Sequence, residues 1–397
     1  MEYLLEAFNF AKWPKIYYGP GITKSLENTL ADLDNVLWVT GGKEGYYSSY
    51  FKMFLTISGI NINSKNLVQI SGEPSPQDID AICQRFQDEN NQTNINKVIG
   101  IGGGSVLDAA KALSAMLVTQ HSLLDYLEGI GKGLTLPDNI LPFVAIPTTS
   151  GTGSEMTSNA VFSQVGDQGY KKSIRHDKLI PTEIWLDSSL TTTCPPLQTA
   201  CCGLDAFTQL LEAYLSTKSN LMTDMLAEKG MQLIIDNLDA ACSHGAQNTK
   251  VRGALAIASM LSGSCLTNAG LGIVHGIAGP MGGFYDIPHG VACAGLIAKA
   301  NQVTLDVMIR ENNNKDITKM AKIGLLCSDH KTLTKEQYCQ ALVDKLYRWQ
   351  KKFKIPKFAQ YGLNHATLDQ LISASSYRNN PVKLSDKEIR DIIQACI

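Results

Sequence analysis

The hydrophobic positions in the first half of the chain form short apolar runs that alternate with segments of helical spacing. Four apolar runs predict β-strands, at residues 35–40, 66–71, 97–104 and 142–147. Three amphipathic segments between them predict helices, at residues 46–59, 76–90 and 105–118. Alternating strands and helices are typical of a parallel β-sheet covered by helices. The first half is therefore predicted to be an α/β domain.

The pattern changes after about residue 190, where strand-like runs become rare. A stretch rich in Ser, Thr and Pro, which includes Pro195 and Pro196, separates the two patterns. Long helical patterns then occupy residues 203–216, 221–238, 251–266 and 336–353. We therefore predict two domains, an α/β dinucleotide-binding domain at residues 1–191 and an all-helical domain at residues 192–397.

The composition is that of an ordinary globular protein. The 397 residues are 44% hydrophobic and 18% charged, and the formal net charge is −2. Such a chain lacks the basic surface that nucleic acid or an anionic membrane needs, so neither is expected as a partner. The N-terminus has no secretory-signal pattern, and no apolar run approaches the roughly 20 residues that span a bilayer. A cytoplasmic location is expected.

The ten cysteines are more typical of free thiols than of disulfides. No CxxC pair occurs, which leaves zinc-finger and thioredoxin-like sites without support. Cys83, Cys293 and Cys327 lie in apolar runs, where buried thiols are common in proteins of a reducing compartment.

A glycine-rich turn joins the third predicted strand to the helix that follows it. It consists of Gly102, Gly103, Gly104 and Ser105. Glycines allow a ligand to approach the backbone closely, and a helix N-terminus attracts anions through its free N–H groups. The turn predicts a pyrophosphate site, with a tight turn that binds no ligand as the alternative. It does not match the GxGxxG dinucleotide fingerprint.

A second polar loop follows the next strand, at residues 147–155. Its side chains that can donate to phosphate or ribose oxygens are Thr148, Thr149, Thr152 and Ser154. Loops at the carboxyl ends of parallel strands flank the crevice in which ligands of α/β sheets bind. A serine nucleophile is not expected, because the loop has no GxSxG elbow and no evident His/Asp partner.

The tip of the first predicted strand bears on the choice of dinucleotide. In NAD-binding folds, an acid near this point often holds the ribose 2′-hydroxyl. Here the strand ends in Gly41, Gly42 and Lys43, without an acid. A lysine can bind the 2′-phosphate, which favours NADP over NAD. The alternative is that Lys43 is a solvated loop cation.

Three polar residues lie in apolar surroundings in the second half of the chain. His275 and His289 fall within a Gly-rich apolar stretch, and Asp205 lies on an otherwise apolar helical face. An unpaired polar group is costly in such a place. One aspartate and two histidines form a common three-ligand site for a divalent metal, with an open position for substrate. A purely structural role is the alternative.

Four motifs together give the chain a resemblance to the iron-containing (group III) alcohol dehydrogenase family. They are GGGSVLDAAK, PTTSGTGSE, GLDAFTQLLEAY and VHGIAGPMGGFYDIPHGVACA, in family-like order and spacing over nearly the whole chain. The resemblance implies a dehydroquinate synthase-like architecture, with a dinucleotide and a divalent metal between an α/β and an all-helical domain. It also implies homodimers and reversible hydride transfer between a small alcohol or aldehyde and NAD(P).

By the same resemblance, the metal ligands fall on Asp205, Gln209, His275 and His289. The family normally has histidine at the second of these positions. Asp108 and Lys172 join the residues near the dinucleotide, and Gly279 stands where the family often has a histidine near the nicotinamide. A glutamine oxygen is a weaker donor than imidazole. Zinc is therefore as plausible as iron, and a weak or absent metal is an alternative.

The expected mechanism is metal-assisted hydride transfer. A metal held by Asp205, His275 and His289 polarises the substrate oxygen while hydride passes to or from the nicotinamide. Without a histidine at Gly279, protons must move through water or ribose hydroxyls. Three alternatives keep the fold: a metal-independent reductase, a dinucleotide-binding protein that has lost catalysis, and a metal-dependent lyase related to dehydroquinate synthase. The lyase would need a cluster of basic residues that the sequence near the histidines lacks.

Overall fold

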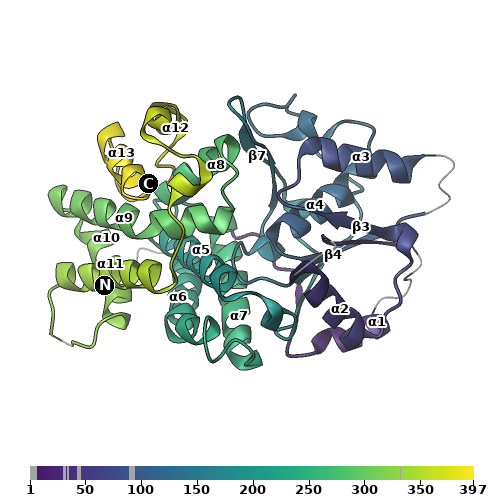
Figure 1. The fold of residues 1–397 in the computed structure, drawn as a ribbon, viewed down its shortest axis with the longest axis horizontal. Coiled ribbons are helices and arrows are strands. Elements are labelled where there is room, and N and C mark those ends of the chain that lie inside the picture. The colour runs from purple at the N-terminus through teal and green to yellow at the C-terminus, as the bar shows by residue number, and fades with distance from the viewer. Residues whose placement is uncertain (1–6, 30–32, 34, 43–45, 89–93, 331) are drawn as a thin grey trace.

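The protein consists of a sheet-containing region and a helical region that lie side by side (Figure 1). The computed structural model describes residues 7–29, 33, 35–42, 46–88, 94–330 and 332–397. The strands of the described residues all lie before residue 187, and long helices follow. The predicted fold class, an α/β region followed by an all-helical one, is confirmed.

A six-stranded parallel sheet forms the centre of the first region, in the order β1-β8-β5-β4-β2-β3. The strands are β1 (Lys15–Tyr18), β2 (Val36–Gly41), β3 (Leu67–Ile70), β4 (Lys97–Gly102), β5 (Phe143–Pro147) and β8 (Glu183–Leu186). From β2 the chain moves outwards to β3, whereas from β4 it moves the other way through β5 to β8. Ligands of open α/β sheets bind at such a reversal. Here it lies between the ends of β2 and β4.

Both faces of the sheet are covered by helices. Leu37 and Val39 of β2 share a core with α3 (Pro76–Gln87) and α4 (Gly104–Met116). Trp38, between them in sequence, belongs to the opposite core with α2 (Tyr46–Ser58), because successive side chains of a strand point to opposite faces. A short helix, α1 (Leu26–Thr29), precedes β2. Strands buried on both faces read as continuous apolar runs, which is why these runs predicted the sheet.

A two-stranded antiparallel hairpin connects β5 to β8 and was not predicted from the sequence. It consists of β6 (Asn159–Gln164) and β7 (Tyr170–Arg175). The hairpin packs closely on the helical region: a Cβ atom added to Gly283 would lie 2.9 Å from the Tyr170 backbone. It therefore brings the side chains of β7 towards the helices.

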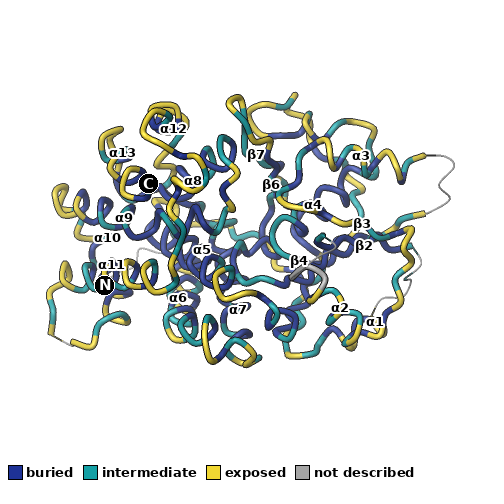
Figure 2. The backbone as a smooth tube through the Cα atoms, in the orientation of Figure 1, coloured by how far each residue is buried: buried dark blue, intermediate teal, exposed yellow. Residues whose placement is uncertain are grey.

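The helical region is built around one buried helix. Its helices are α5 (Pro196–Leu215), α6 (Leu221–Ala241), α7 (Thr249–Ala269), α8 (Ile273–Phe284), α9 (His289–Arg310), α10 (Asn314–Leu326), α11 (Lys335–Lys352), α12 (Leu368–Ala374) and α13 (Asp386–Gln394). Every residue of α5 from Gly203 to Leu215 is buried, as the dark tube in Figure 2 shows. Polar side chains on this helix are therefore shielded from bulk water.

Membrane insertion of a single helix finds no support in the described residues. None of their helices is both long and apolar enough to cross a bilayer. The pair α7 and α8 reaches the length and composition only when taken together, and it is bent by 97°.

Two glycine backbones form a direct contact between the two regions. Gly153, in the loop after β5, adopts a left-handed conformation with φ of +61°, which favours glycine. Gly263 lies in the middle of α7. A Cβ atom added to Gly263 would lie 2.0 Å from the Gly153 carbonyl oxygen. No side chain separates these two backbone segments at this point.

Candidate active site

The glycine turn after β4 lies against the polar loop after β5. Gly103 caps α4 without a side-chain hydrogen bond. A Cβ atom added to Gly103 would lie 3.1 Å from Thr149 Oγ1, and one added to Gly104 would lie 2.8 Å from Thr152. The structure thus brings together the two loops that the sequence singled out. Side chains at Gly103 and Gly104 would collide with this loop.

Asp108 of α4 and Ser154 of the polar loop are joined by a hydrogen bond next to this turn. Ser154 Oγ donates to Asp108 Oδ1 at 2.5 Å, and the Val161 N–H donates to Asp108 Oδ2 at 3.0 Å. Burial raises the pKa of Asp108, and the nearby Lys111 ammonium, 3.7 Å from Oδ1, opposes that rise. These bonds fasten the loop to α4. Thr148 adds a backbone link, since its N–H donates to the Gly102 carbonyl at 3.0 Å.

The tip of β2 is held by Tyr50, whose hydroxyl accepts the Gly41 N–H at 2.8 Å. A Cβ atom added to Gly42 would lie 3.1 Å from Ser71 Oγ. Lys43 lies outside the described residues. The acid that follows β3, Glu73, is engaged by Lys171 at 2.5 Å.

Lys172 and Lys171 point to different places. The Lys172 ammonium lies 3.9 Å from where a Cβ atom on Gly129 would be, on the sheet-containing region. Lys171 lies beside α8, 3.0 Å from where a Cβ atom on Gly282 would be. Of these two residues of β7, Lys171 is therefore the one that faces the helical region.

Asp205, His275 and His289 come together from three helices. Asp205 lies in the middle of α5, His275 near the start of α8, and His289 at the first residue of α9. Asp205 Oδ1 is 3.4 Å from His275 Nε2 and 3.7 Å from His289 Nε2. Asp205 is 1% exposed, the His275 side chain 7% and the His289 side chain 23%, so His289 is the least buried of the three.

Glu212 fixes the orientation of His275. Its Oε2 lies 2.7 Å from His275 Nδ1, and its Oε1 accepts the Val274 N–H at 2.6 Å. A carboxylate on Nδ1 keeps a proton there, so Nε2, which faces Asp205, is the nitrogen that gives up its proton when a metal ion binds. The carboxylate also binds the backbone next to the histidine, so the ring has little freedom to rotate.

The pKa values of the two histidines are shifted in opposite directions. Burial lowers the pKa of His275, but the Cys293, Glu212 and Asp205 groups outweigh burial and hold the pKa well above its ordinary value. Burial lowers the pKa of His289 to about 4, and Lys171 adds to this against the pull of Asp205. His289 is therefore a neutral imidazole at neutral pH, the form that binds metals.

The cluster fits a divalent metal ion. Asp205 Oδ1 is buried and has no hydrogen-bond partner of normal geometry among the described residues, although two imidazole nitrogens face it. A buried, unpartnered carboxylate oxygen is costly unless a cation or donor satisfies it. Oxygen and imidazole donors suit zinc and ferrous iron alike.

Comparison with known proteins identifies the family. Residues 14–188 match the profile of iron-containing alcohol dehydrogenases, and residues 199–397 match the C-terminal profile of the Fe-containing alcohol dehydrogenase family. The chain belongs to the iron-containing alcohol dehydrogenase family. It is therefore an NAD(P)-dependent alcohol dehydrogenase, and the resemblance seen in the sequence is confirmed.

Individual members of the iron-containing alcohol dehydrogenase family align over different shares of the chain. A 1-propanol dehydrogenase of Citrobacter freundii is 38% identical over 66% of this chain and 65% of its own length, slightly under two thirds. An NADPH-dependent butanol dehydrogenase of Clostridium saccharobutylicum is 28% identical over 96% of this chain and 95% of its own. A crystal structure of 1,3-propanediol oxidoreductase has a TM-score of 0.83 and 26% identity, covering 99% of this chain and 100% of that one.

Two positions of this iron-containing alcohol dehydrogenase depart from the pattern that the resemblance implied. Gln209 is buried on α5, and its Oε1 lies 2.9 Å from Ser262 Oγ on α7. Gly279 faces the guanidinium of Arg378, whose Nη2 lies 3.7 Å from where a Cβ atom on Gly279 would be. Arg378 has a φ of +46°, which is strained for a side chain of this kind. An arginine thus lies where a histidine at position 279 would extend.

Sequence reasoning missed several residues around the metal cluster of this iron-containing alcohol dehydrogenase. Glu212 follows Asp205 by seven residues, so two full turns of helix place both on one face, and this spacing was a usable signal. Cys293 follows His289 by four residues, which is the same kind of signal. Arg378 could be named from the sequence as a residue able to contact a polar substrate group, but its place beside α8 gave no signal, because only the fold brings it there.

Replacing Glu212 by glutamine is expected to lower the metal affinity of this iron-containing alcohol dehydrogenase about 10–100-fold. Groups that orient a metal-binding histidine have effects of that size. The measurement is competition for Zn²⁺ against a chelator of known affinity. Glu228→Gln is the matched control, since Glu228 is a carboxylate of α6 paired with Lys322 and Tyr214. Unchanged Zn²⁺ affinity in Glu212→Gln would contradict the role given to Glu212.

Proposed function

We propose that this dehydrogenase interconverts a small alcohol and its aldehyde or ketone by metal-assisted hydride transfer, with NADP preferred over NAD. The observation that carries the metal-assisted reaction is the buried Asp205 oxygen that faces two imidazole nitrogens. When bound, a divalent ion supplies Lewis-acid polarisation of the substrate oxygen, and the nicotinamide supplies or accepts the hydride.

The residues of the chain have separate tasks in this proposal. Asp205, His275 and His289 hold the ion, and Glu212 keeps the His275 lone pair aimed at it. Substrate approaches on the His289 side, because His289 is the least buried of the three. The burial of the other ligands excludes water from the reacting oxygen, which strengthens the electrostatic interactions there.

The dinucleotide is proposed to bind along the glycine turn. The backbone N–H groups at the start of α4 donate to the pyrophosphate, and the helix end favours its negative charge. Thr149 and Thr152, which touch the turn, are the proposed neighbours of the nicotinamide half. Asp108 and Ser154 keep that loop on α4 through their mutual hydrogen bond.

The preference for NADP rests on the tip of β2 and on Glu73, the acid that follows the neighbouring strand β3. Gly41 and Gly42 carry no carboxylate that could hold a ribose 2′-hydroxyl. Glu73 is neutralised by Lys171 and also accepts from Ser163. Lys43 remains the proposed partner of the 2′-phosphate, and Lys172 remains a proposed cation near the dinucleotide.

Proton transfer in this proposal does not use a histidine next to the nicotinamide, because position 279 is a glycine. Gly279 offers no side chain, and the adjacent Arg378 is a guanidinium that stays protonated even though burial lowers its pKa. Arg378 can orient a polar substrate group but cannot relay a proton. Protons therefore move through water or the ribose hydroxyls. The cytoplasmic location and the homodimeric state stay predictions.

Turnover of small aldehydes is expected only after loading with Fe²⁺ or Zn²⁺, with NADPH giving a higher kcat/KM than NADH. The measurement is NAD(P)H oxidation by metal-loaded and chelator-stripped protein against a panel of aldehydes and ketones. The variant Lys43→Ala tests the cofactor preference: its KM for NADPH should rise, and its KM for NADH should stay unchanged.

Two other results would each point to a different function. Equal turnover in both preparations would favour a metal-independent reductase of the same fold. Tight dinucleotide binding without turnover on any carbonyl would favour a protein that has lost catalysis.

A further inference from the structure

A cysteine thiol completes the cluster of Asp205 and the two histidines. Cys293 lies one turn after His289 on α9, on the same face of the helix, and it is fully buried. Its Sγ is 3.6 Å from His275 Nε2 and 3.7 Å from His289 Nε2. The ligand atoms of Asp205, His275, His289 and Cys293 all lie within 4.8 Å of one another.

The spacing of these donors matches the edges of a tetrahedral metal site. With Zn–S of about 2.3 Å, Zn–N of about 2.05 Å and Zn–O of about 2.1 Å, tetrahedral angles give S···N edges of about 3.6 Å and N···O edges of about 3.4 Å. The two S···N distances are 3.6 and 3.7 Å, and the two N···O distances are 3.4 and 3.7 Å. Four of the six donor–donor distances therefore match a tetrahedral site, and the other two are within 4.8 Å.

The hydrogen bonds that the thiol can make without a metal are weak. The two imidazole nitrogens lie 3.6 and 3.7 Å from the sulfur, within hydrogen-bond range, but an S–H group is a weak donor. His275 Nδ1 is already bound to Glu212, which aims Nε2 at the shared centre. A cation at that centre would satisfy the Asp205 oxygen, both nitrogens and the sulfur at once.

We propose that Cys293 binds the catalytic metal ion through its thiolate, so that the protein ligands are Asp205, His275, His289 and Cys293. This inference rests on the proposed metal-assisted function. The thiol proton passes to solvent when the ion binds. Cys293 supplies the fourth strong donor that Gln209 does not, since the Gln209 amide oxygen is a neutral ligand and already contacts the Ser262 hydroxyl.

The proposed donor set has consequences for the identity of the metal. A thiolate with two imidazoles and one carboxylate is softer than a set of nitrogen and oxygen donors alone, so it selects Zn²⁺ over Mg²⁺ or Mn²⁺. The four ligands lie on α5, α8 and α9. His289 is the least buried of the ligands, so substrate is proposed to enter beside it as a fifth ligand.

Cobalt substitution tests the thiolate ligand without relying on activity. Wild-type protein loaded with Co²⁺ is expected to show thiolate-to-cobalt charge-transfer absorption in the near ultraviolet. Cys293→Ser should lose that band and bind Zn²⁺ at least about a hundredfold more weakly, because even outer groups of metal sites change affinity 10–100-fold. Circular dichroism and thermal melting establish that the variant is folded.

Two variants serve as controls for this measurement. Cys265→Ser removes another fully buried thiol of the helical region, which donates to the Thr223 carbonyl on α6, and it should keep the band. Gln209→Ala should also keep it, because a neutral amide gives no such charge transfer. A band that survives in Cys293→Ser would overturn the proposal.

X-ray absorption at the zinc edge of the wild-type protein gives a test that needs no variant. One sulfur scatterer at about 2.3 Å is expected beside nitrogen and oxygen scatterers at about 2.0–2.2 Å. A shell of nitrogen and oxygen alone would overturn the role of Cys293 and leave the metal-assisted function standing. Failure of the wild-type protein to bind Zn²⁺ or Co²⁺ at all would overturn both.

Discussion

Replacing His275 by alanine is expected to lower kcat/KM for aldehyde reduction by about a thousandfold. The substitution removes one imidazole donor and leaves Glu212 without the hydrogen bond to Nδ1. Loss of Lewis-acid assistance costs several kcal/mol of transition-state stabilisation, and about 4 kcal/mol corresponds to a factor of about 10³. The rate is measured with NADPH on protein incubated with Zn²⁺ or Fe²⁺, and bound metal is measured by elemental analysis.

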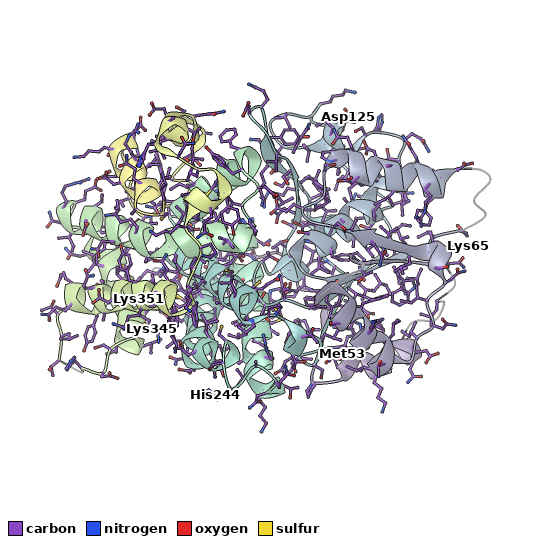
Figure 3. All side chains as sticks on the ribbon, viewed as in Figure 1. Met53, Lys65, Asp125, His244, Lys345 and Lys351 are labelled. Atoms are coloured by element: carbon purple, nitrogen blue, oxygen red, sulfur yellow. The ribbon has the colours of Figure 1, made fainter. Side chains whose placement is uncertain are left out.

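Dinucleotide affinity should survive in the same variant. The glycine turn belongs to α4 in the other region, whereas His275 belongs to α8. Fluorescence titration with NADPH is expected to give a Kd within about twofold of the wild type. His244→Ala is the control, because His244 is an exposed histidine on the rim of the helical region (Figure 3). Full turnover by His275→Ala would rule out the metal-centred mechanism.

Replacing Gly104 by alanine is expected to weaken NADPH binding by about 10–100-fold. The new Cβ atom would lie 2.8 Å from Thr152, so either the loop or the start of α4 must shift. A shift there removes a backbone N–H from the pyrophosphate, and a hydrogen bond to a charged group is worth about 1.5–3 kcal/mol. The Kd is measured by fluorescence titration, and far-ultraviolet circular dichroism establishes that the helices are intact.

A double-mutant cycle separates this steric effect from a direct role of Thr152. Thr152→Ala removes the two side-chain atoms nearest to the new methyl group. The double variant Gly104→Ala/Thr152→Ala should lose less NADPH-binding free energy than the two single variants lose together, because the clash is then relieved. Strict additivity would show that the clash with Thr152 is not the cause, and an unchanged Kd in Gly104→Ala would place the pyrophosphate elsewhere.

The sequence predicted four of the six strands of the parallel sheet, and it missed β1 and β8, although most of β8 is buried. The strands β2, β4 and β5 read as apolar runs because helices cover both faces of the sheet. The hairpin of β6 and β7 was missed, because β7 carries Lys171, Lys172 and Arg175 and only one of its residues is buried. A strand with one polar face in a short hairpin gives too weak a pattern to recognise.

The site could be predicted only as far as local motifs reach. Asp205, His275 and His289 stood out as polar groups in apolar stretches, and their helices do bring them together. The partners that decide their chemistry were less visible. Glu212 and Cys293 were marked only by their helical spacing from Asp205 and His289, and their contacts with the histidines form only when the helices pack. Arg378 reaches α8 from the segment before α13, which no local pattern could indicate.

The glycine contact between Gly153 and Gly263 has a consequence for how this enzyme can diversify. The Gly153 loop carries the groups proposed to surround the nicotinamide, and Gly263 is the neighbour of Ser262, which touches α5 through Gln209. If the dinucleotide and the metal bind as proposed, the spacing between hydride donor and metal is set by main chain against main chain, which has no rotamers to change. Pocket side chains on either region can be exchanged, by evolution or by an engineer, while the reaction distance is inherited unaltered.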